Sequence, residues 1–229
     1  MTDKAIEAII NKLNKGDYSN IFLQRISENV EYGIAWHKVI QFHPLKGKYK
    51  KEIRDCFYLI KNEKSCYVGA VLVMEKLEDL HAFVKKEYRN QGYLTKAMTK
   101  SILPHLISKK GKQRITIDID RLGERKYNIS KKSALRIGFH QVSESDFNIT
   151  RKDISMVETF QIVKYGMTIE RVKQLSEKMD GLSDEISKID DEFGMNLGNI
   201  PVLGKLKQIL KEYGSHKLED EYWKLKGNI

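Results

Sequence analysis

The sequence predicts an α+β fold in which a mixed, mostly antiparallel sheet is flanked by helices and followed by an added C-terminal helical element. Between Glu78 and Lys110 the pattern changes from a short apolar strand, through a charged turn, to apolar residues at helical spacing. The elements of residues 1–165 read helix, strand, helix, three strands, helix, strand, helix and two strands, an order that fits this fold. From residue 166 a heptad pattern of apolar residues takes over.

Local signals define each of these elements. Apolar residues recur at helical spacing in the expected helices, and the expected strands are rich in β-branched and aromatic residues. Ser27 suits the N-cap of the second helix, Pro104 should kink or divide the third, and Gly138 caps the fourth. Residues 46–54 carry five cations and one Glu, which predicts a solvated loop, although the same charges also suit an anionic partner. In chain order, we expect a helix at 3–13, a strand at 21–26, a helix at 27–40, strands at 56–61, 65–74 and 78–84, a helix at 93–108, a strand at 114–119, a helix at 130–137, and a closing hairpin of strands at 140–145 and 153–164.

Composition narrows the class of protein. The chain contains two cysteines, Cys56 and Cys66, without a C-x-x-C motif or a histidine cluster, so we expect neither a disulfide framework nor a metal site. No apolar stretch reaches the roughly 18 residues that a membrane span requires, and the N-terminus lacks the charged-then-apolar order of a signal peptide. We therefore expect a cytoplasmic protein that does not associate with membranes.

The basic charge is concentrated in one part of the chain. Residues 166–229 carry 10 Lys and Arg against 12 Asp and Glu, which leaves 31 against 19, a net charge of +12, for residues 1–165. A positive field of this kind attracts CoA, RNA including tRNA, or an acidic protein, and it is equally compatible with a generally basic surface.

The turn around Gly92 has the features of a phosphate-binding site. The first N–H groups of a helix lack partners and lie at the positive end of its dipole, and glycine lets the backbone approach a ligand closely. The stretch V-K-K-E-Y-R-N-Q-G-Y-L-T-K-A-M closely resembles the acetyl-CoA loop of the GNAT superfamily of N-acetyltransferases, with Arg89 and Gly92 at matching positions. Leu94 departs from the family pattern, which has a small residue there.

A second match follows downstream. The stretch N-I-S-K-K-S-A-L-R-I-G-F-H resembles the second cofactor helix of the family and its closing G-F, so the resemblance covers roughly residues 18–163. It implies a GNAT-like acetyltransferase domain over 1–165, with a C-terminal extension over 166–229. It also implies that the fourth and fifth strands splay apart to admit CoA, and that a backbone N–H near Phe83 or Val84 stabilises the oxyanion. The acetyl-CoA-binding residues implied by the resemblance are Phe83, Val84, Arg89, Asn90, Gln91, Gly92, Tyr93, Leu94, Thr95 and Ser130.

Three residues are candidates for catalytic proton transfer. His81 lies in the strand before the turn, and histidine is the side chain type most often used for proton transfer near neutral pH, although an exposed strand-edge histidine is the more ordinary interpretation. Asp118 is expected to share a strand face with Asp120 and would need burial to act as a base. The family often has a tyrosine in the second cofactor helix that protonates the departing thiolate. Ala134 stands at that position here, so Tyr127 is the candidate for this role.

The heptad positions from Val172 to Phe193 predict a long helix. This helix would pack on its own domain, on a returning helix at 202–213, or on a second copy of the chain, which would give a homodimer through residues 167–213. Together, the patterns predict an acetyl-CoA-dependent N-acetyltransferase that acts on a primary amine of a protein, a small molecule or an aminoacyl-tRNA. The alternative is a non-catalytic CoA- or RNA-binding module of the same fold that dimerises through its C-terminal helices.

Overall fold

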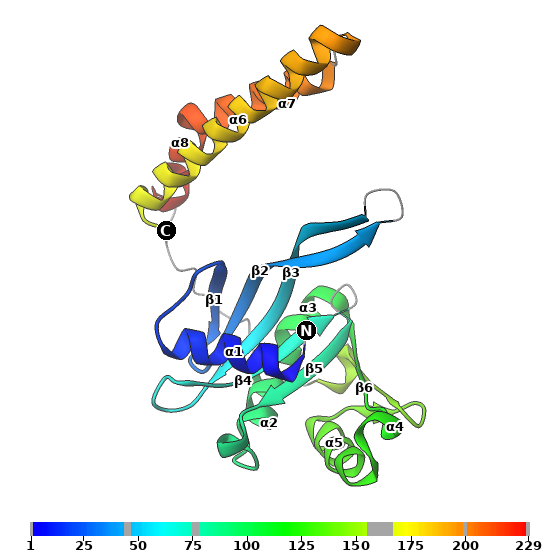
Figure 1. Ribbon diagram of the computed structural model, residues 1–229. Helices are drawn as coiled ribbons and strands as arrows, with labels where there is room; N and C mark the ends of the chain where they lie inside the picture. Colours follow the sequence, from blue (N-terminus) through cyan, green and yellow to red (C-terminus); the bar gives the residue numbers. More distant parts are fainter. Residues whose placement is uncertain (1, 44–46, 75–77, 155–166, 199–200, 228–229) are drawn as a thin grey trace. The chain divides into compact units, whose positions relative to one another are not determined.

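In the computed structural model, the chain forms two compact units, Met1–Lys164 and Tyr165–Ile229. The structure describes residues 2–43, 47–74, 78–154, 167–198 and 201–227. The first unit holds an open sheet with helices on both faces, and the described part of the second unit is helical (Figure 1). The expected α+β class, with a mostly antiparallel sheet flanked by helices, is confirmed.

The sheet contains eight strands within the described residues. They are β1 (Ile21–Ser27), β2 (Val30–His43), β3 (Gly47–Lys61), β4 (Tyr67–Met74), β5 (Asp79–Val84), β6 (Lys112–Thr116), β7 (His140–Gln141) and β8 (Asp146–Thr150). Their order across the sheet is β1-β2-β3-β4-β5-β6-β8-β7. All neighbours are antiparallel except β5 and β6, which are parallel because a helical crossover connects them.

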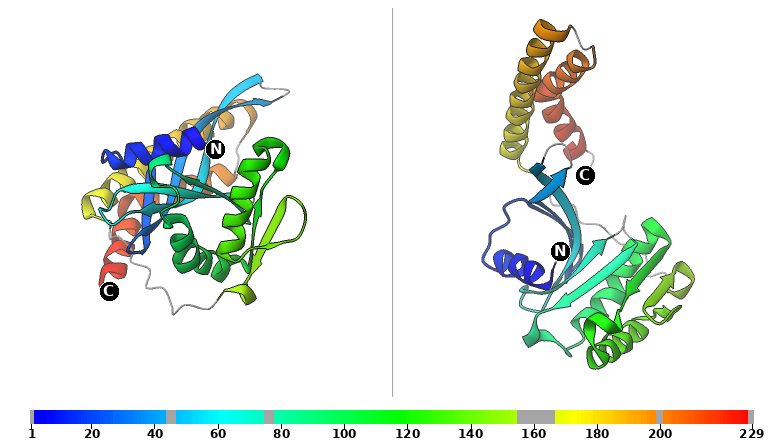
Figure 2. Two further views of the ribbon diagram at one scale, coloured as in Figure 1. Left: turned by 90° about the horizontal axis from the view of Figure 1, so that it is seen from below. Right: turned by 45° about the vertical axis from the view of Figure 1, so that its right-hand side comes forward.

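Helices bury both faces of the sheet (Figure 2). On one face, α1 (Asp3–Asn14) packs Ile10 against Leu59 and Leu72. On the other face, Leu106 packs against Tyr58 and Val71. The helical elements of this second face are α2 (Tyr93–Ala97), the π-helical turn η3 (Met98–Ile102), α3 (Leu103–Lys110), α4 (Ile119–Leu122) and α5 (Glu124–Ile137). Because both faces are covered, β4 is apolar and buried along nearly its whole length.

The expected helix at 27–40 is wrong, because this segment is the long strand β2. The spacing of Val30 and Ile34 fits a strand face as well as a helix face, and pairing with neighbouring strands decides between them. Val30 is buried opposite Ile60 of β3. The expected loop at 46–54 is also wrong over its described residues, since β3 begins at Gly47 and pairs with β2 along its length.

Three further expectations concern segment ends. The helix at 93–108 is divided at η3, just before Pro104 in the first turn of α3, as its proline predicted. The closing hairpin is formed by β7 and β8. The last strand was expected at 153–164, but Arg151–Asp153 form a 3₁₀ turn, and residues 155–164 lie outside the described residues.

The second unit is built on α6 (Ile169–Leu197), whose first turn is capped by the Thr168 hydroxyl. The chain returns through α7 (Pro201–Glu212), the turn η5 (Tyr213–Lys217) and α8 (Leu218–Gly227). Ser183 donates a hydrogen bond to the Lys207 carbonyl at 3.4 Å, so the return helix packs on α6. Three residues of the heptad row remain exposed: Leu182 at 54%, Ile189 at 43% and Phe193 at 41%. None of the helices in the described ranges has the length and apolar character that crossing a membrane requires.

Candidate functional site

The turn between β5 and α2 has an unusual backbone. Asn90 and Gly92 both take positive φ angles, +61° and +81°, and Gly92 is the N-cap of α2. No side chain in the described chain caps this helix end, so N–H groups of its first turn are left for an external acceptor. Two side chains fix the turn: Arg89 donates through Nε to the Val84 carbonyl at 2.9 Å, and Gln91 donates to the Glu87 carbonyl at 2.8 Å. Alternating positive φ values of this kind create a concave anion site.

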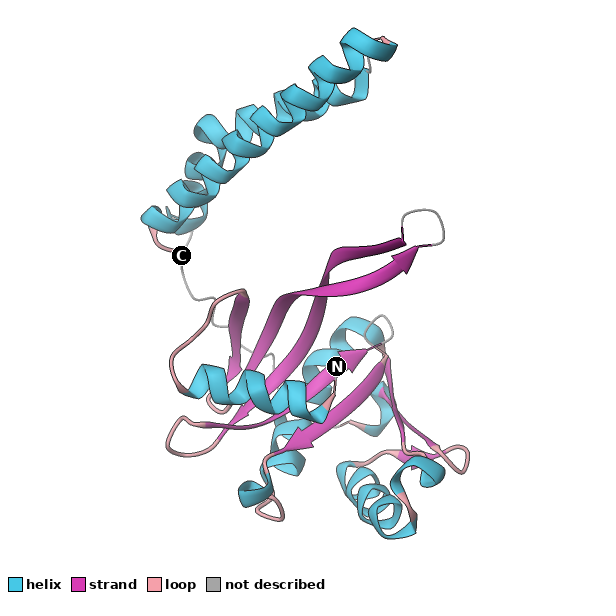
Figure 3. Cartoon of the chain, viewed as in Figure 1, coloured by secondary structure: helices cyan, strands magenta, loops and turns pink. Residues whose placement is uncertain are grey.

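The parallel strands β5 and β6 separate at the start of β5, and the rest of β5 leads into this turn. They pair at a single position, Asp79 with Arg114, where the Arg114 N–H donates to the Glu78 carbonyl at 2.8 Å. The carboxylate of Asp79 also lies 3.6 Å from the Arg114 guanidinium and accepts from the Leu80 N–H at 3.1 Å. From this point the two strands diverge in Figure 3. The remainder of β5 therefore has an edge that β6 does not cover.

The hydrogen bonds between β5 and β4 show which backbone groups of β5 face that uncovered edge. The Lys85 N–H donates to the Val68 carbonyl of β4 at 2.9 Å. Because alternate residues of a strand present their N–H groups to opposite edges, Phe83 faces β4, while Ala82 and Val84 face the edge that β6 leaves. Of the two expected oxyanion donors, the Val84 N–H therefore faces the uncovered edge, whereas the Phe83 N–H faces β4. The Phe83 side chain is buried in the cluster under α1.

The charged groups of the turn leave a positive balance beside Gly92. Lys85 donates to Asn11 and forms an ion pair with Glu87, both at 3.1 Å. A backbone N–H bond and then the Lys85 ammonium hold the pKa of Glu87 below its usual range. Lys86 and Arg89 are the other cations of the segment. Since Glu87 is the one acidic residue among residues 84–95, the turn has a net positive charge.

Tyr93, Leu94 and Thr95 form the first turn of α2. The Tyr93 hydroxyl donates to Glu63 at 2.8 Å, and this carboxylate raises the pKa of Tyr93. Leu94 packs against the core, and the Thr95 carbonyl accepts from the Thr99 hydroxyl at 2.9 Å. These contacts hold the start of the helix in place. Ser130, the remaining expected cofactor residue, lies on α5 and is half-buried.

The three expected proton-transfer residues have three different sets of partners. His81 bonds Asp3 of α1 at 2.7 Å, on the sheet face opposite α2. Tyr127 is buried and donates its hydroxyl proton to the Glu144 carbonyl at 2.7 Å. Within the part of the chain that the structure describes, no hydrogen bond or ion pair joins His81, Tyr127 and Asp118 to one another.

Asp118 has a structural role that the strand pattern did not reveal. The expectation that it shares a strand face with Asp120 is wrong, because β6 ends at Thr116. Asp118 is instead the N-cap of α4, where its Oδ1 accepts from the N–H groups of Asp120 and Arg121 at 2.9 and 3.3 Å. A carboxylate that holds two helix N–H groups is poorly suited to act as a base.

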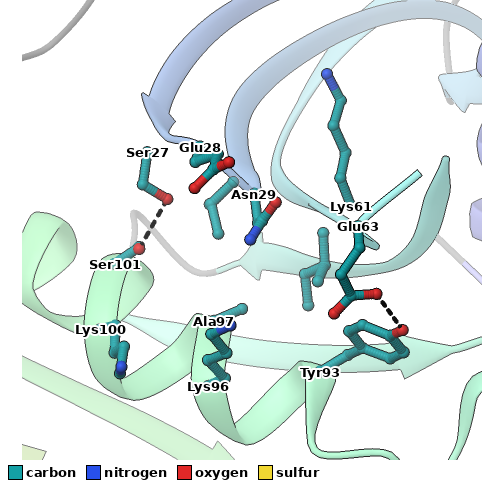
Figure 4. A pocket seen from close by; sticks show the side chains of 12 residues that line it. Ser27, Glu28, Asn29, Lys61, Glu63, Tyr93, Lys96, Ala97, Lys100 and Ser101 are labelled. Atoms are coloured by element: carbon teal, nitrogen blue, oxygen red, sulfur yellow. Dashed lines mark hydrogen bonds between the residues drawn. The ribbon is translucent and has the colours of Figure 1, made fainter. Parts of the chain in front are cut away.

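A pocket of about 280 Å³ lies beside α2 (Figure 4). Its lining comes from the β1–β2 turn, the end of β3, and α2 with η3. The charged residues of the lining are Glu28, Lys61, Glu63, Lys96 and Lys100. Tyr93 is the one expected site residue in it, so the pocket flanks the turn without containing it.

The sequence did not reveal these pocket residues, nor that the Ala82 N–H faces the uncovered edge of β5. Glu63 and Lys96 come from separate elements, and no spacing in the sequence brings them together. Within the described residues, no group of three or more His, Cys, Asp or Glu side chains is placed to hold a metal ion. Neither a protein-family model nor a curated protein matches this sequence.

Proposed function

We propose that residues 1–165 form an acetyl-CoA-dependent N-acetyltransferase of the GNAT type, acting on a primary amine in the cytoplasm. The observation that carries this proposal is the separation of β5 from β6 after Asp79, which leaves the edge of β5 uncovered from there to the turn at Gly92. The strands part after one residue pair, and the uncovered edge of β5 leads into a turn with two positive φ angles. CoA has a long amide-containing chain that suits a strand edge and a diphosphate that suits such a turn.

The turn offers several donors to a diphosphate. The first N–H groups of α2 point out of the helix end, and the helical run continues from Tyr93 to Lys110. Arg89 uses Nε to hold the Val84 carbonyl, which leaves its other guanidinium N–H groups for phosphate oxygens. An added Cβ at Gly92 would meet no atom within 4 Å, so space for a ligand exists directly at the turn.

The edge of β5 supplies the group that the reaction most needs. In acetyl transfer the amine nitrogen attacks the thioester carbonyl carbon, a C–N bond forms, the C–S bond breaks, and the amine loses a proton while the thiolate leaves. Negative charge develops on the carbonyl oxygen, and a fixed N–H donor stabilises it. The Val84 N–H lies on the uncovered edge next to the turn, so we assign it this role.

Proton transfer passes through solvent in this proposal. The hydroxyl proton of Tyr127 is donated to Glu144, and Asp118 accepts from two helix N–H groups. The neutral amine is then the attacking species, and the rate rises with pH as the free-base fraction of the amine rises. Water protonates the departing thiolate.

The same contacts favour a second candidate function, a non-catalytic module that binds CoA. Because Tyr127 and Asp118 are engaged in the fold, the candidate acid and base expected from the sequence are not gathered at the β5 edge. A module of this kind would keep the turn and the diverging strands but would transfer no acetyl group.

Mass spectrometry separates the two functions. The full chain is incubated with acetyl-CoA and, in turn, a peptide with a free N-terminus, a lysine peptide, a polyamine and an aminoacyl-tRNA. An acetylated product supports the enzyme and identifies the acceptor class. Binding of acetyl-CoA without any acetylated product supports the binding module, and absence of binding contradicts both.

A backbone variant tests the assigned donor. Val84→Pro removes the N–H group but leaves the carbonyl that Arg89 contacts. We expect a loss of turnover with acetyl-CoA affinity retained. Ala82→Pro is the matched control, since it removes the other N–H group on the same edge. Equal losses in both variants would contradict the specific role of Val84.

A further inference from the structure

Strands β2 and β3 continue beyond the rest of the sheet as a two-stranded ribbon. Pairing with β1 ends at Ala35, and pairing with β4 begins at Cys56. Apart from the Trp36 N–H, which donates to the Asn20 carbonyl at 3.1 Å, residues 36–43 and 47–54 therefore pair only with each other, and we call them the β-arm (Figure 1). A ribbon of this kind has no neighbouring strand along either edge.

One face of the β-arm is an ordered array of apolar and cationic side chains. Phe42 pairs with Lys48, Ile40 with Lys50, and Trp36 with Arg54. Directly paired residues point to the same face, with Cβ atoms about 5 Å apart. The apolar residues thus form a row on β2 that Lys38 interrupts, and the cations form a parallel row on β3 that Glu52 interrupts. Lys38 and Glu52 lie directly opposite each other on this same face. Phe42, Ile40 and Trp36 are 74%, 71% and 43% exposed.

On the opposite face of the β-arm, the polar side chains interact with one another. Tyr49 donates to Gln41 at 2.9 Å, and His37 lies 3.6 Å from Asp55. Val39 and Ile53 on this face are half-buried. The exposed aromatic residues are therefore not a general property of the ribbon but belong to one face.

The charge of the β-arm selects the class of partner. Its described residues include Lys38, Lys48, Lys50, Lys51 and Arg54 against Glu52, a net charge of +4. Glu52 already pairs with Lys38 at 3.8 Å. Two arms of this charge would repel each other, which disfavours a second copy on this face. The charge complements a polyanion, and the apolar row requires that this polyanion also present flat apolar groups.

We propose that this face of the β-arm binds single-stranded nucleic acid. Bases stack on Trp36 and Phe42, while phosphates lie along the row of Lys48, Lys50 and Arg54. Trp36 and Phe42 are about 20 Å apart along the strand, so the face spans a few nucleotides. A single strand carries bases on one side and phosphates on the other, which matches the two rows.

The geometry favours nucleic acid over an anionic membrane. Lys48 lies directly opposite Phe42 on the same face, and Lys50 lies opposite Ile40. Inserting the apolar row into hydrocarbon would bring these ammonium groups with it at considerable cost. Stacking on a base needs no such burial. The proposal does not depend on acetyl transfer, since none of the residues in the two rows belongs to the turn at Gly92.

Fluorescence anisotropy of labelled homopolymers tests the proposal. The full chain is titrated with uridine and thymidine oligomers of about 12 nucleotides at several salt concentrations. We expect affinity to fall steeply with salt. The Lys48→Gln, Lys50→Gln double variant should reduce the slope of log affinity against log salt by about 1.4. Lys51→Gln, on the opposite face of the same strand, is the matched control and should change the slope little.

Aromatic variants test stacking separately from charge. Trp36→Ala and Phe42→Ala should each weaken binding roughly 5- to 150-fold with the salt slope unchanged. Phe22→Ala is the control, because Phe22 is also exposed, at 55%, but lies on β1 outside the β-arm. All of these side chains are exposed, so melting temperatures should match that of the parent chain. Similar affinities for the uridine and thymidine oligomers would mean that the bases stack without recognition of the 2′-hydroxyl group. A preference for the uridine oligomer would add recognition of that hydroxyl. Both results support the proposal.

Several outcomes would overturn it. They are a lack of oligonucleotide binding, binding that is indifferent to Trp36 and Phe42, equal competition by polyglutamate, and preferential binding to phosphatidylserine vesicles. The second and third would show only a general attraction between charges. The last would assign the face to membranes.

Discussion

Gly92→Glu should abolish tight acetyl-CoA binding at a modest cost in stability. Gly92 has φ +81°, and an added Cβ would meet no atom within 4 Å. The substitution therefore creates no clash with the protein. Its cost to the fold is the strain of a left-handed conformation, about 1–2 kcal/mol. For a unit of this size, we expect a melting temperature lowered by about 2–8 °C.

The effect on binding is larger because the new carboxylate lies where the diphosphate is proposed to bind. Two unit charges about 6 Å apart repel by about 0.7 kcal/mol in water and about 3 kcal/mol at the effective dielectric of a protein surface. This repulsion corresponds to roughly a 3- to 100-fold loss of affinity for each phosphate charge. The volume of the side chain excludes the ligand further.

Calorimetric titration with acetyl-CoA measures this loss, and the chain provides a matched control. Gly16, at the end of α1, also has φ +81° and open space around an added Cβ. Gly16→Glu should therefore lower the melting temperature as much as Gly92→Glu does while leaving acetyl-CoA affinity unchanged. If Gly92→Glu binds acetyl-CoA as well as the parent chain, the site is not at this turn.

The remaining predictions concern the core, the buried tyrosine and the second unit. His105 is buried with Nδ1 2.6 Å from the Tyr58 hydroxyl, and burial lowers its pKa to about 4. The unfolded chain therefore binds more protons than the folded chain between pH 6.5 and 4. The unfolding free energy should fall by up to about 3 kcal/mol as pH drops through this range. In urea unfolding, His105→Gln should reduce this dependence of the unfolding free energy on pH, and an unchanged dependence would contradict the assignment. Tyr127→Phe should cost about 0.5–1.5 kcal/mol by removing one hydrogen bond to the Glu144 carbonyl, which still accepts from Gln141 Nε2 at 3.3 Å, with acetyl transfer within a few-fold of the parent rate. A hundred-fold slower transfer at full stability would make Tyr127 the catalytic acid. Ile186→Asp, on the half-buried side of α6, should lower the melting temperature. Leu182 is exposed, so Leu182→Asp should change only self-association, measured by sedimentation. Unchanged sedimentation of Leu182→Asp would count against a homodimer through this heptad row.

Local signals predicted much of the fold. Apolar spacing located α1 and the long helix α6, and the expected cap Gly138 ends α5 at φ +111°. The division of the helix after Gly92 followed from Pro104. Each of these features depends on residues that are close in sequence, which is why they could be read from the sequence.

Other elements depend on partners far along the chain. Residues 27–40 have apolar spacing that fits both a helix and a strand, and pairing with β1 and β3 decides the outcome. The cationic residues Lys48 and Lys50 suggested a loop, but a two-stranded ribbon is exposed to solvent and therefore also accommodates charged residues. The structure of this region was therefore not available from local pattern.

The candidate site divides in the same way. The turn and its glycine were visible in the sequence, because a left-handed position before a helix favours glycine. The choice of Val84 over Phe83 depends on the bond from Lys85 to Val68, which no local pattern reveals. Asp118 lies within the alternating stretch at 114–119 that resembles a strand, and only the end of β6 at Thr116 shows it to be a helix cap.

Amide hydrogen exchange with and without acetyl-CoA tests the central claim most directly. We predict slower exchange at Val84 and across residues 89–95, with no change in the β-arm, which serves as an internal reference. Protection confined to other segments, or no protection at saturating acetyl-CoA, would contradict the assignment of the cofactor site to the β5 edge and the Gly92 turn.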